Sequence, residues 1–351
     1  MRVRCRAVPE VLINARAAAR RQLSGVERWA AELAARLPAL APDRYAVAWP
    51  PRGMAYQAGQ AWEQLVLPAR ARRAGARLLL NPANLAPLRF DGNVVVIHDA
   101  VSLTHPEWFS GPYAAWHRRM LPAVARRARL VLTVSAFSRD EIAATTGVDP
   151  AGIVVVPGGV DERFTPDADA AGARSALGLD RPYVLTVAGE GARKNQAVLG
   201  ATARALAEHG IELVAAGSRR AHHGPAGDLA GIRRLGYVPD PLLPGLYAGA
   251  RAFVLPSLHE GFGLPCLEAM AAGVPVVASD RGALPETCGE AALLVEPRRP
   301  DLIAEAVLAA CLDEAEAGRL RAAGRARAAR FSWDATARAV DAVLTGADRR
   351  V

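Results

Sequence analysis

The chain has 351 residues and is 51% hydrophobic, enough to bury the cores of two domains. No apolar stretch approaches the roughly 18–20 residues that span a bilayer, and charges throughout the first 30 positions leave no signal-peptide core. The four cysteines lack metal-like or paired spacing, which is typical of a reducing compartment. We therefore expect a cytoplasmic protein without a disulfide or a zinc site.

The net charge is +8, and all but one of the 43 basic residues are arginine. Abundant alanine, glycine and arginine point to a coding bias, so arginine clusters such as 70–77 and 118–129 are weak signs of a partner. Nucleic-acid binding would require a recognisable binding module with interleaved aromatic residues, and the sequence contains none. We expect no nucleic-acid partner.

In chain order, short apolar strands alternate with helical patterns through the first 160 residues. Serine followed three residues later by glutamate, the capping-box pattern, predicts helix starts at Ser24 and Ser138. Strands that alternate with helices predict a parallel sheet covered on both faces. The predicted strands are Val11–Asn14, Arg44–Trp49, Arg77–Leu80, Val94–Ile97 and Leu130–Val134.

The alternation breaks at Asp161–Arg181, which is polar and punctuated, and then restarts. We interpret the stretch Phe164–Gly172 as an interdomain linker. The chain is therefore predicted to form two doubly wound α/β domains, residues 1–165 and 166–330, with a final helical segment at 331–351 that returns to the first domain. The strands predicted for the second domain are Tyr183–Val187, Ile211–Ala216, Ala252–Leu255 and Pro275–Ala278.

Ligands of doubly wound sheets bind outside the carboxyl ends of the strands. Polar residues that follow predicted strands are therefore candidates for one site. They are Asn14 with the Ser24–Gly25 loop, His98 with Asp99, Ser135, Arg193 with Lys194, and Glu260 with Glu268.

Arg193 and Lys194 follow the predicted strand 183–187 at a strand–helix turn, where two cations would neutralise a pyrophosphate. Gly189-x-Gly191 begins a dinucleotide-binding pattern, but Lys194 stands where its third glycine belongs. An exposed structural pair is the alternative. The only lysine of the chain lies at this turn, and a compact ammonium suits phosphate oxygens where a planar guanidinium does not.

The most informative motif runs from Leu258 to Gly273 and carries Glu260 and Glu268 with seven residues between them. Pro265 suits the first position of a short helix, and Gly273 suits its left-handed end. The amides of Gly261, Phe262 and Gly263 would then face outward at a helix N-terminus and form a phosphate site. Two hydroxyl-binding carboxylates beside a phosphate site predict a nucleotide-sugar site, whereas a local arginine pair for Glu268 is the structural alternative.

His98 and Asp99 end the strand 94–97, where His98 either anchors a loop or contacts the reacting sugar. The remaining histidines, including His105 and the adjacent His222 and His223, show no ligand spacing, so we predict no metal site. An Asp-x-Asp motif for a metal-bound diphosphate occurs at Asp167–Asp169, but within the predicted linker.

Taken together, these residues resemble glycosyltransferase family 4, with the two-domain GT-B fold. The resemblance covers nearly the whole chain, is strongest over Tyr247–Ser279, and is closest to bacterial mannosyltransferase-like members. It implies a retaining hexosyltransferase whose two Rossmann-like domains face each other across a cleft. The first would take the acceptor and the second a nucleotide-sugar donor, with GDP-mannose as the expected donor, no cofactor and no metal.

Carried over position by position, the resemblance implies a role for each site residue. Glu268 would bind the ribose hydroxyls, and Arg193 and Lys194 would neutralise the departing diphosphate. His98 and Gly25 would close over the donor sugar from the first domain. The remaining donor contacts would be Glu260 with the segment Gly261, Phe262, Gly263 and Leu264 on the sugar and phosphate, and Tyr237 with Val238 at the base.

Two alternatives stay open: an epimerase of GT-B architecture and a non-catalytic nucleotide-sugar-binding protein. The acceptor is a saccharide, a lipid-linked sugar or a small molecule, with contacts expected from 102–116. The predicted helix 113–129 places Trp116, Met120 and Val124 beside several arginines, a pattern that would also suit peripheral contact with the inner membrane surface.

Overall fold

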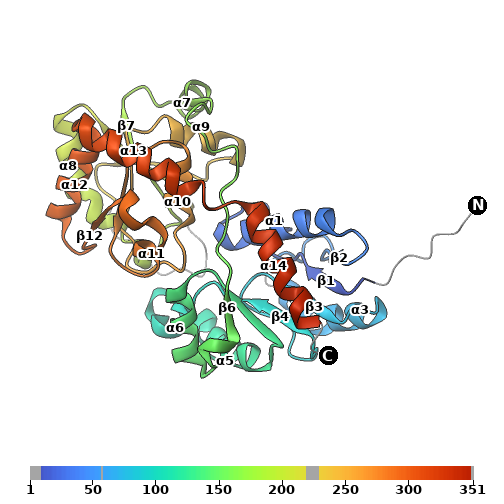
Figure 1. Cartoon of the computed structure of the whole chain (residues 1–351). Coiled ribbons are helices and arrows are strands. Elements are labelled where there is room, and N and C mark those ends of the chain that lie inside the picture. The colour runs from blue at the N-terminus through green and yellow to red at the C-terminus, as the bar shows by residue number, and fades with distance from the viewer. Residues whose placement is uncertain (1–8, 57, 219–228, 349–351) are drawn as a thin grey trace, which may run out of the picture. The chain divides into compact units, whose positions relative to one another are not determined.

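The computed structural model describes residues 9–56, 58–218 and 229–348 (Figure 1). The chain divides into two compact units. Unit 1 consists of Met1–Thr104, Ala115–Gly158 and Trp333–Val351, and unit 2 consists of His105–Ala114 and Gly159–Ser332. The last helix is therefore grouped with the first half of the chain, and a short segment of the first half is grouped with the second.

Unit 1 is built on a parallel six-stranded sheet in the order β2-β1-β3-β4-β5-β6. Its strands are β1 (Val11–Asn14), β2 (Tyr45–Ala48), β3 (Leu78–Asn81), β4 (Asn93–Val96), β5 (Leu130–Thr133) and β6 (Ile153–Val155). β1, β3 and β4 are buried along their whole length, as expected for parallel strands covered on both faces. The sequence predicted every strand except β6.

The helices that accompany this sheet include one of the two predicted capping boxes. α1 begins after Ser24, whose amide donates to the Glu27 carboxylate at 3.0 Å. α14 packs beside α1, with an ion pair between Arg36 and Asp334 (Figure 1). The helices are α1 (Gly25–Leu40), α2 (Ala58–Ala61), the π-helix η1 (Trp62–Val66), α3 (Leu67–Arg73), α4 (Val101–Thr104), α5 (Gly111–Arg127), α6 (Ala136–Thr146), η3 (Pro150–Gly152) and α14 (Trp333–Asp348). The short helix η2 (Pro106–Trp108) and the first residues of α5 lie in the segment grouped with unit 2.

The predicted helix start at Ser138 is wrong by three residues. α6 begins directly after β5, and its cap is Ser135, whose side chain accepts from the Ser138 amide at 3.0 Å. Ser138 lies inside the helix and donates to the His98 carbonyl at 2.9 Å. The predicted partner Glu141 instead accepts from the Ala100 amide at 2.9 Å.

Unit 2 contains a second parallel six-stranded sheet, in the order β12-β11-β10-β7-β8-β9. Its strands are β7 (Tyr183–Val187), β8 (Glu212–Ala216), β9 (Ile232–Gly236), β10 (Ala252–Leu255), β11 (Val276–Ser279) and β12 (Leu293–Val295). The sequence analysis missed β9 and β12, the two edge strands. One core cluster of apolar side chains includes Leu185 and Phe253, and a second includes Val184 and Val254, so neighbouring residues of these strands enter different clusters.

The helices of unit 2 correct the predicted linker. Phe164 is 3% exposed in the unit 2 core, and α7 begins within the supposed linker, where Asp169 accepts from the Gly172 amide at 2.8 Å. The Asp167–Asp169 motif therefore lies at the start of this helix. The helices are α7 (Ala170–Leu177), η4 (Ala192–Lys194), η5 (Gln196–Leu199), α8 (Gly200–Glu208), η6 (Asp240–Leu242), α9 (Leu243–Ala248), α10 (Leu264–Ala271), α11 (Leu284–Cys288), η7 (Gly289–Ala291), α12 (Pro300–Leu312) and α13 (Glu314–Ala328).

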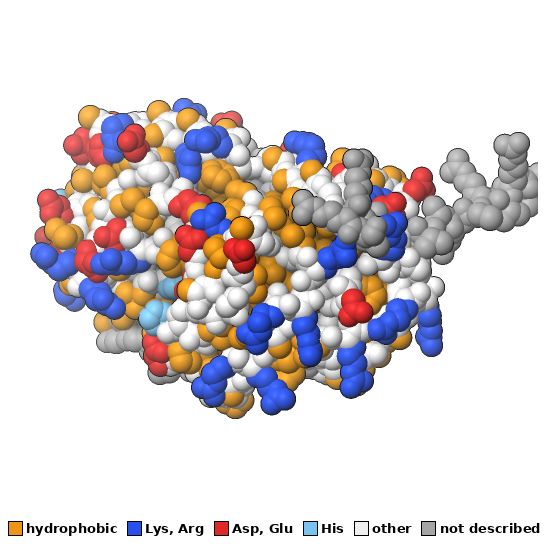
Figure 2. Space-filling model, turned by 60° about the horizontal axis from the view of Figure 1, so that its bottom comes forward, with side chains coloured by type: hydrophobic (Ala, Val, Ile, Leu, Met, Phe, Trp, Pro, Cys, Tyr) orange, Lys and Arg blue, Asp and Glu red, His pale blue; other side chains and the backbone are white. Residues whose placement is uncertain are grey.

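The proposed membrane face of α5 is not formed. Met120 and Val124 are 5% and 2% exposed within the unit 1 core, which leaves Trp116 as the exposed member of that set. Figure 2 shows Lys and Arg side chains as separate groups on one face, divided by other surface. Among the described residues, no helix combines the length and the apolar character needed to cross a membrane.

Candidate functional site

The carboxyl ends of β7 and β10 carry the main cluster of charged side chains. These two strands are neighbours in the sheet, and the chain order reverses between them, which makes this edge the topological switch point of unit 2. Arg193 and Lys194 follow β7, and Glu260 follows β10. The fold therefore brings Lys194 together with Glu260, which lies 66 positions later in the sequence.

Glu260 is paired with both cations. The Lys194 ammonium donates to Glu260 Oε1, and Arg193 Nη1 lies 3.6 Å from Glu260 Oε2. Ser257, two residues after the end of β10, donates to Glu260 Oε1 at 2.7 Å. Lys194 and Glu260 are 9% and 6% exposed.

The pKa of Glu260 reports the strength of this arrangement. Burial raises the pKa, but the charges of Lys194 and Arg193 and the hydrogen bonds outweigh it and lower the pKa to about 2. Glu260 is therefore ionised at neutral pH. The side chains of Arg193, Lys194 and Glu260 together carry a net charge of +1.

Backbone contacts fix the two loops that carry these charges. The Leu258 amide donates to the Arg193 carbonyl at 2.8 Å, which ties the loop after β10 to the loop after β7. Asn195, in the left-handed region at φ 53°, donates from its side chain to the carbonyls of Pro256 and Pro297 at 3.1 and 2.7 Å. The charged side chains thus project from an anchored turn.

The glycine-rich entry to α10 has the expected form. Gly263 precedes α10 with a φ of 99°, Pro265 lies in the first turn, and Gly273 follows with a φ of 72°. A Cβ on Gly263 would lie 2.5 Å from Leu284 Cδ2. Gly261 and Leu264 are buried and Phe262 is partly buried, with its ring 5.9 Å from the Phe331 ring.

Glu268 projects from α10 and is 8% exposed. The hydroxyl of Tyr247 on α9 donates to Glu268 Oε2 at 2.9 Å. Tyr247 is itself fully buried between the rings of Phe164 and Phe253, each with its centroid 5.5 Å away. The carboxylate is therefore held by a rigid neighbour.

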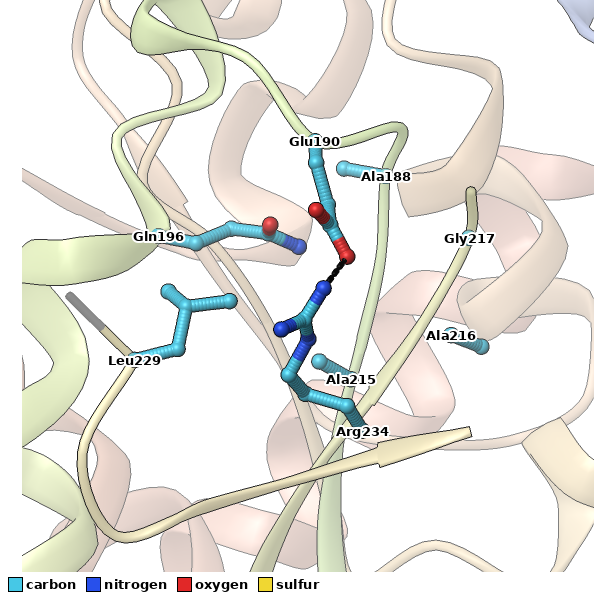
Figure 3. Close-up of a pocket in the computed structure, with 8 residues that line it drawn as sticks. All are labelled: Ala188, Glu190, Gln196, Ala215, Ala216, Gly217, Leu229 and Arg234. Atoms are coloured by element: carbon cyan, nitrogen blue, oxygen red, sulfur yellow. Dashed lines mark hydrogen bonds and ion pairs between the residues drawn. The ribbon is translucent and has the colours of Figure 1, made fainter. Parts of the chain in front are cut away.

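The residues predicted to face the base lie beyond β9. Tyr237 is 42% exposed, whereas Val238 is buried at 4%. The Gly236 carbonyl, directly before Tyr237, accepts from the Gly217 amide at 2.7 Å. Gly217 lines a shallow hollow, in which Glu190 and Arg234 form an ion pair and the Gln196 amide points toward that pair (Figure 3).

Unit 1 has a polar cluster at its own switch point, between β1 and β3. Asn14, at the end of β1, donates to Asn81, at the end of β3, at 3.1 Å and also to Glu63. Arg16 pairs with Glu63 at 2.9 Å, and both side chains are below 10% exposed. Here the charges cancel within the cluster.

The two predicted sugar contacts of unit 1 lie close to one helix. Gly25 is the first residue of α1 and is exposed, with open space around the position of a Cβ. The His98 ring packs edge-on against Trp29, one turn further along α1, with centroids 5.6 Å apart.

Hydrogen bonding defines the chemistry of His98. Its Nε2 lies 2.9 Å from the Pro82 carbonyl, and because a carbonyl only accepts, Nε2 carries the proton. Burial lowers the pKa of His98, so the ring is neutral at neutral pH. Nδ1 of this tautomer is a hydrogen-bond acceptor.

The chain is similar to known glycosyltransferases. Residues 23–164 match Glycosyltransferase Family 4, and residues 181–313 match Glycosyl transferases group 1. The O-antigen chain mannosyltransferase B of Escherichia coli is 34% identical over 265 residues, which cover 71% of this chain and 68% of that protein. The chain belongs to glycosyltransferase family 4.

A further relative supports this family assignment, and a solved structure supports the fold. The MMP alpha-(1->4)-mannosyltransferase of Mycolicibacterium hassiacum is 35% identical over 269 residues, 72% of this chain and 63% of that protein. The structure of sucrose-phosphate synthase from Thermosynechococcus elongatus matches with a TM-score of 0.75 at 21% identity and covers 98% of this chain and 100% of that chain. This glycosyltransferase is thus a mannosyltransferase-like protein with the GT-B fold.

Sequence reasoning assigned no role to two residues that orient the carboxylates of this glycosyltransferase, Ser257 and Tyr247. Ser257 had a usable signal, because it follows a buried strand and precedes Glu260 by three residues. Tyr247 is fully buried, and a buried tyrosine hydroxyl requires a hydrogen-bond partner. Among the described residues, no group of three or more His, Cys, Asp or Glu has a metal-binding arrangement; His222 and His223 lie outside them.

Proposed function

We propose that this glycosyltransferase is a retaining, metal-independent hexosyltransferase that moves mannose from GDP-mannose to a hydroxyl of a saccharide, glycolipid or natural-product acceptor. The observation that carries the proposal is the Arg193–Lys194–Glu260 cluster, in which two cations meet one carboxylate. A buried excess positive charge beside a glycine-rich turn favours a diphosphate.

The chemistry follows from charge. Breaking the bond between sugar and diphosphate develops positive charge on the sugar and negative charge on the leaving group. Arg193 and Lys194 would stabilise the leaving group most strongly in the transition state, the role that a metal ion has in other enzymes. Retention would result if the acceptor hydroxyl attacks the same face of the sugar and the departing diphosphate takes its proton.

The other site residues would bind the donor before this step. Glu268, held by Tyr247, would accept from the ribose hydroxyls, and His98 would accept from a sugar hydroxyl through Nδ1. Because His98 is neutral, it would position the sugar rather than donate a proton. The similarity to two mannosyltransferases supports mannose as the transferred sugar.

A thermal-shift panel of GDP, UDP, dTDP and ADP tests the donor half, since a ligand that binds the native state raises its apparent stability. We expect GDP to give the largest shift and Glu268→Ala to abolish it. Glu305→Ala, an exposed glutamate on α12, is the matched control. An unchanged GDP shift in Glu268→Ala would overturn the ribose assignment.

Turnover assays separate the catalytic alternatives. With GDP-mannose, release of GDP that rises with an added acceptor, together with a new α-glycoside by NMR, supports a retaining transferase. Isomerised nucleotide sugar without an acceptor indicates an epimerase. Nucleotide binding without either product indicates a binding protein. Activity that survives EDTA supports independence from a metal.

A further inference from the structure

The segment His105–Tyr113 gathers aromatic side chains in two stacked pairs. The His105 and Trp108 rings stack with centroids 4.0 Å apart and planes 14° from parallel. Phe109 and Tyr113 stack with centroids 5.2 Å apart and planes 20° from parallel. We call these four residues the aromatic platform. It is notable in a chain with only 5% aromatic residues.

The platform carries a carboxylate at its edge. Glu107, between the two stacked partners in sequence, lies 3.0 Å from His105 Nδ1, and its side chain is 60% exposed. Its backbone hydrogen bond and the His105 contact lower the pKa of Glu107. The Trp108 ring is partly exposed although His105 covers one side of it. An accessible indole and an ionised carboxylate are thus adjacent.

The platform also lies near the donor residues of unit 2. His105–Ala114 belongs to this unit, and the His105 ring is 6.3 Å from the ring of His259, the neighbour of Glu260 in sequence. Residues that follow β4 are therefore placed beside the loop that follows β10.

We propose that the aromatic platform binds the saccharide acceptor, with a pyranose ring on Trp108 and its hydroxyls on Glu107. This inference rests on the proposed function and names the acceptor as a carbohydrate. The negative face of an aromatic ring attracts the C–H groups that line one face of a pyranose. A carboxylate accepts from two neighbouring hydroxyls at once.

A membrane surface fits the same residues less well. Glu107 would be repelled by anionic lipid headgroups, and an interfacial helix needs an apolar face. The apolar side chains Met120 and Val124 of α5 are instead buried in the core. Trp116 is 36% exposed on the same helix. Although it ends the range 102–116, it lies outside the two stacked pairs and belongs to unit 1 rather than unit 2, so it provides a matched control.

The test measures acceptor binding without turnover. Methyl α-D-mannopyranoside, the β-glucoside and the β-galactoside serve as probes in saturation-transfer NMR titrations of the full chain. For whichever probe binds, Trp108→Ala should weaken binding about tenfold and Trp108→Phe about threefold, because phenyl retains part of the aromatic face. Glu107→Gln should also weaken it, and Trp116→Ala should leave it unchanged.

Two results would overturn the acceptor assignment: wild-type protein that binds none of the three probes up to 100 mM (roughly the weakest affinity the titration detects), or Trp108→Ala that binds as wild type does. Cosedimentation with phosphatidylglycerol vesicles that both Trp108→Ala and Trp116→Ala abolish would identify a membrane surface instead. The GDP thermal shift should stay unchanged in all four variants. If wild-type protein shows no GDP thermal shift but still binds a sugar probe, the result contradicts the proposed function and not the assignment of the aromatic platform.

Discussion

Both units have a cluster of polar residues at the switch point of their sheet, but the two clusters differ in net charge. In unit 1 the switch point lies between β1 and β3, and in unit 2 it lies between β7 and β10. Arg16 meets one carboxylate, Glu63, so the unit 1 cluster is neutral. Arg193 and Lys194 share one carboxylate, Glu260, so the unit 2 cluster keeps a positive charge.

This difference distinguishes buried charges that have a structural role from buried charges that bind a ligand. A balanced buried pair holds two elements in register, and breaking it leaves an uncompensated charge. An unbalanced cluster retains the capacity to bind an anion. We therefore expect mutations in unit 1 to affect folding first and mutations in unit 2 to affect catalysis first.

The largest effect is expected from Glu63→Ala, which leaves Arg16 buried without its partner. Loss of one member of a buried pair costs about 3–5 kcal/mol, so the urea midpoint should fall sharply. Glu63→Gln should lose less, because its single amide oxygen still accepts from one of the two donors, Arg16 or Asn14. A midpoint within experimental error of wild type in Glu63→Ala would refute the structural role of this cluster.

The next largest effect is on catalysis, from Lys194→Ala. Removing a preorganised charge that faces a leaving group lowers kcat by about 10²–10³-fold. Lys194→Arg should recover part of the rate, since it keeps the charge but not the compact shape. The rate of GDP release gives kcat, and Arg204→Ala, exposed on α8, is the control. A Lys194→Ala rate close to wild type would remove Lys194 from the mechanism.

Most strands of the two sheets could be predicted from the sequence, because buried parallel strands are near-continuous apolar runs. The three missed strands, β6, β9 and β12, all lie at sheet edges. Two of them are only three residues long, and β9 contains Arg233 and Arg234. β6 and β12 are apolar but too short to show a pattern, and the two arginines of β9 interrupt its apolar pattern.

The site could be predicted where its residues lie close together in the sequence. The block from Glu260 to Glu268 combines turn glycines, a helix-starting proline and carboxylates within one short segment. Glu63 was not predictable, since its partners Arg16 and Asn14 are 47 and 49 positions away. The helix cap at Ser135 was missed because Ser135 and Ser138 are both suitable cap residues. α6 begins directly after β5, which ends at Thr133, so the earlier serine is the cap.

The pH dependence of stability provides a smaller test of the unit 2 cluster. The folded pKa of Glu260 is about 2, below the ordinary value of 4.5. Its contribution is therefore fully present above pH 4.5 and is lost as the pH falls toward 2. The shift corresponds to on the order of 3 kcal/mol. The difference in unfolding free energy between wild type and Glu260→Gln should shrink over this range, and a constant difference would contradict the assigned pKa.

The smallest effect is expected from Glu190→Gln, which weakens the ion pair with Arg234 beside the loop that leads to Arg193. The Arg234 side chain is 55% exposed, so solvent screens the pair and its loss should cost at most about 1 kcal/mol. This is the unit 2 counterpart of Glu63, an acid–arginine pair next to the first strand of its sheet, but at the surface. Urea unfolding of Glu190→Gln and Glu63→Gln, measured side by side, compares the two pairs directly. Equal losses would mean that burial does not set their difference, and the contrast between the two units would then have to rest on the catalytic effect of Lys194 alone.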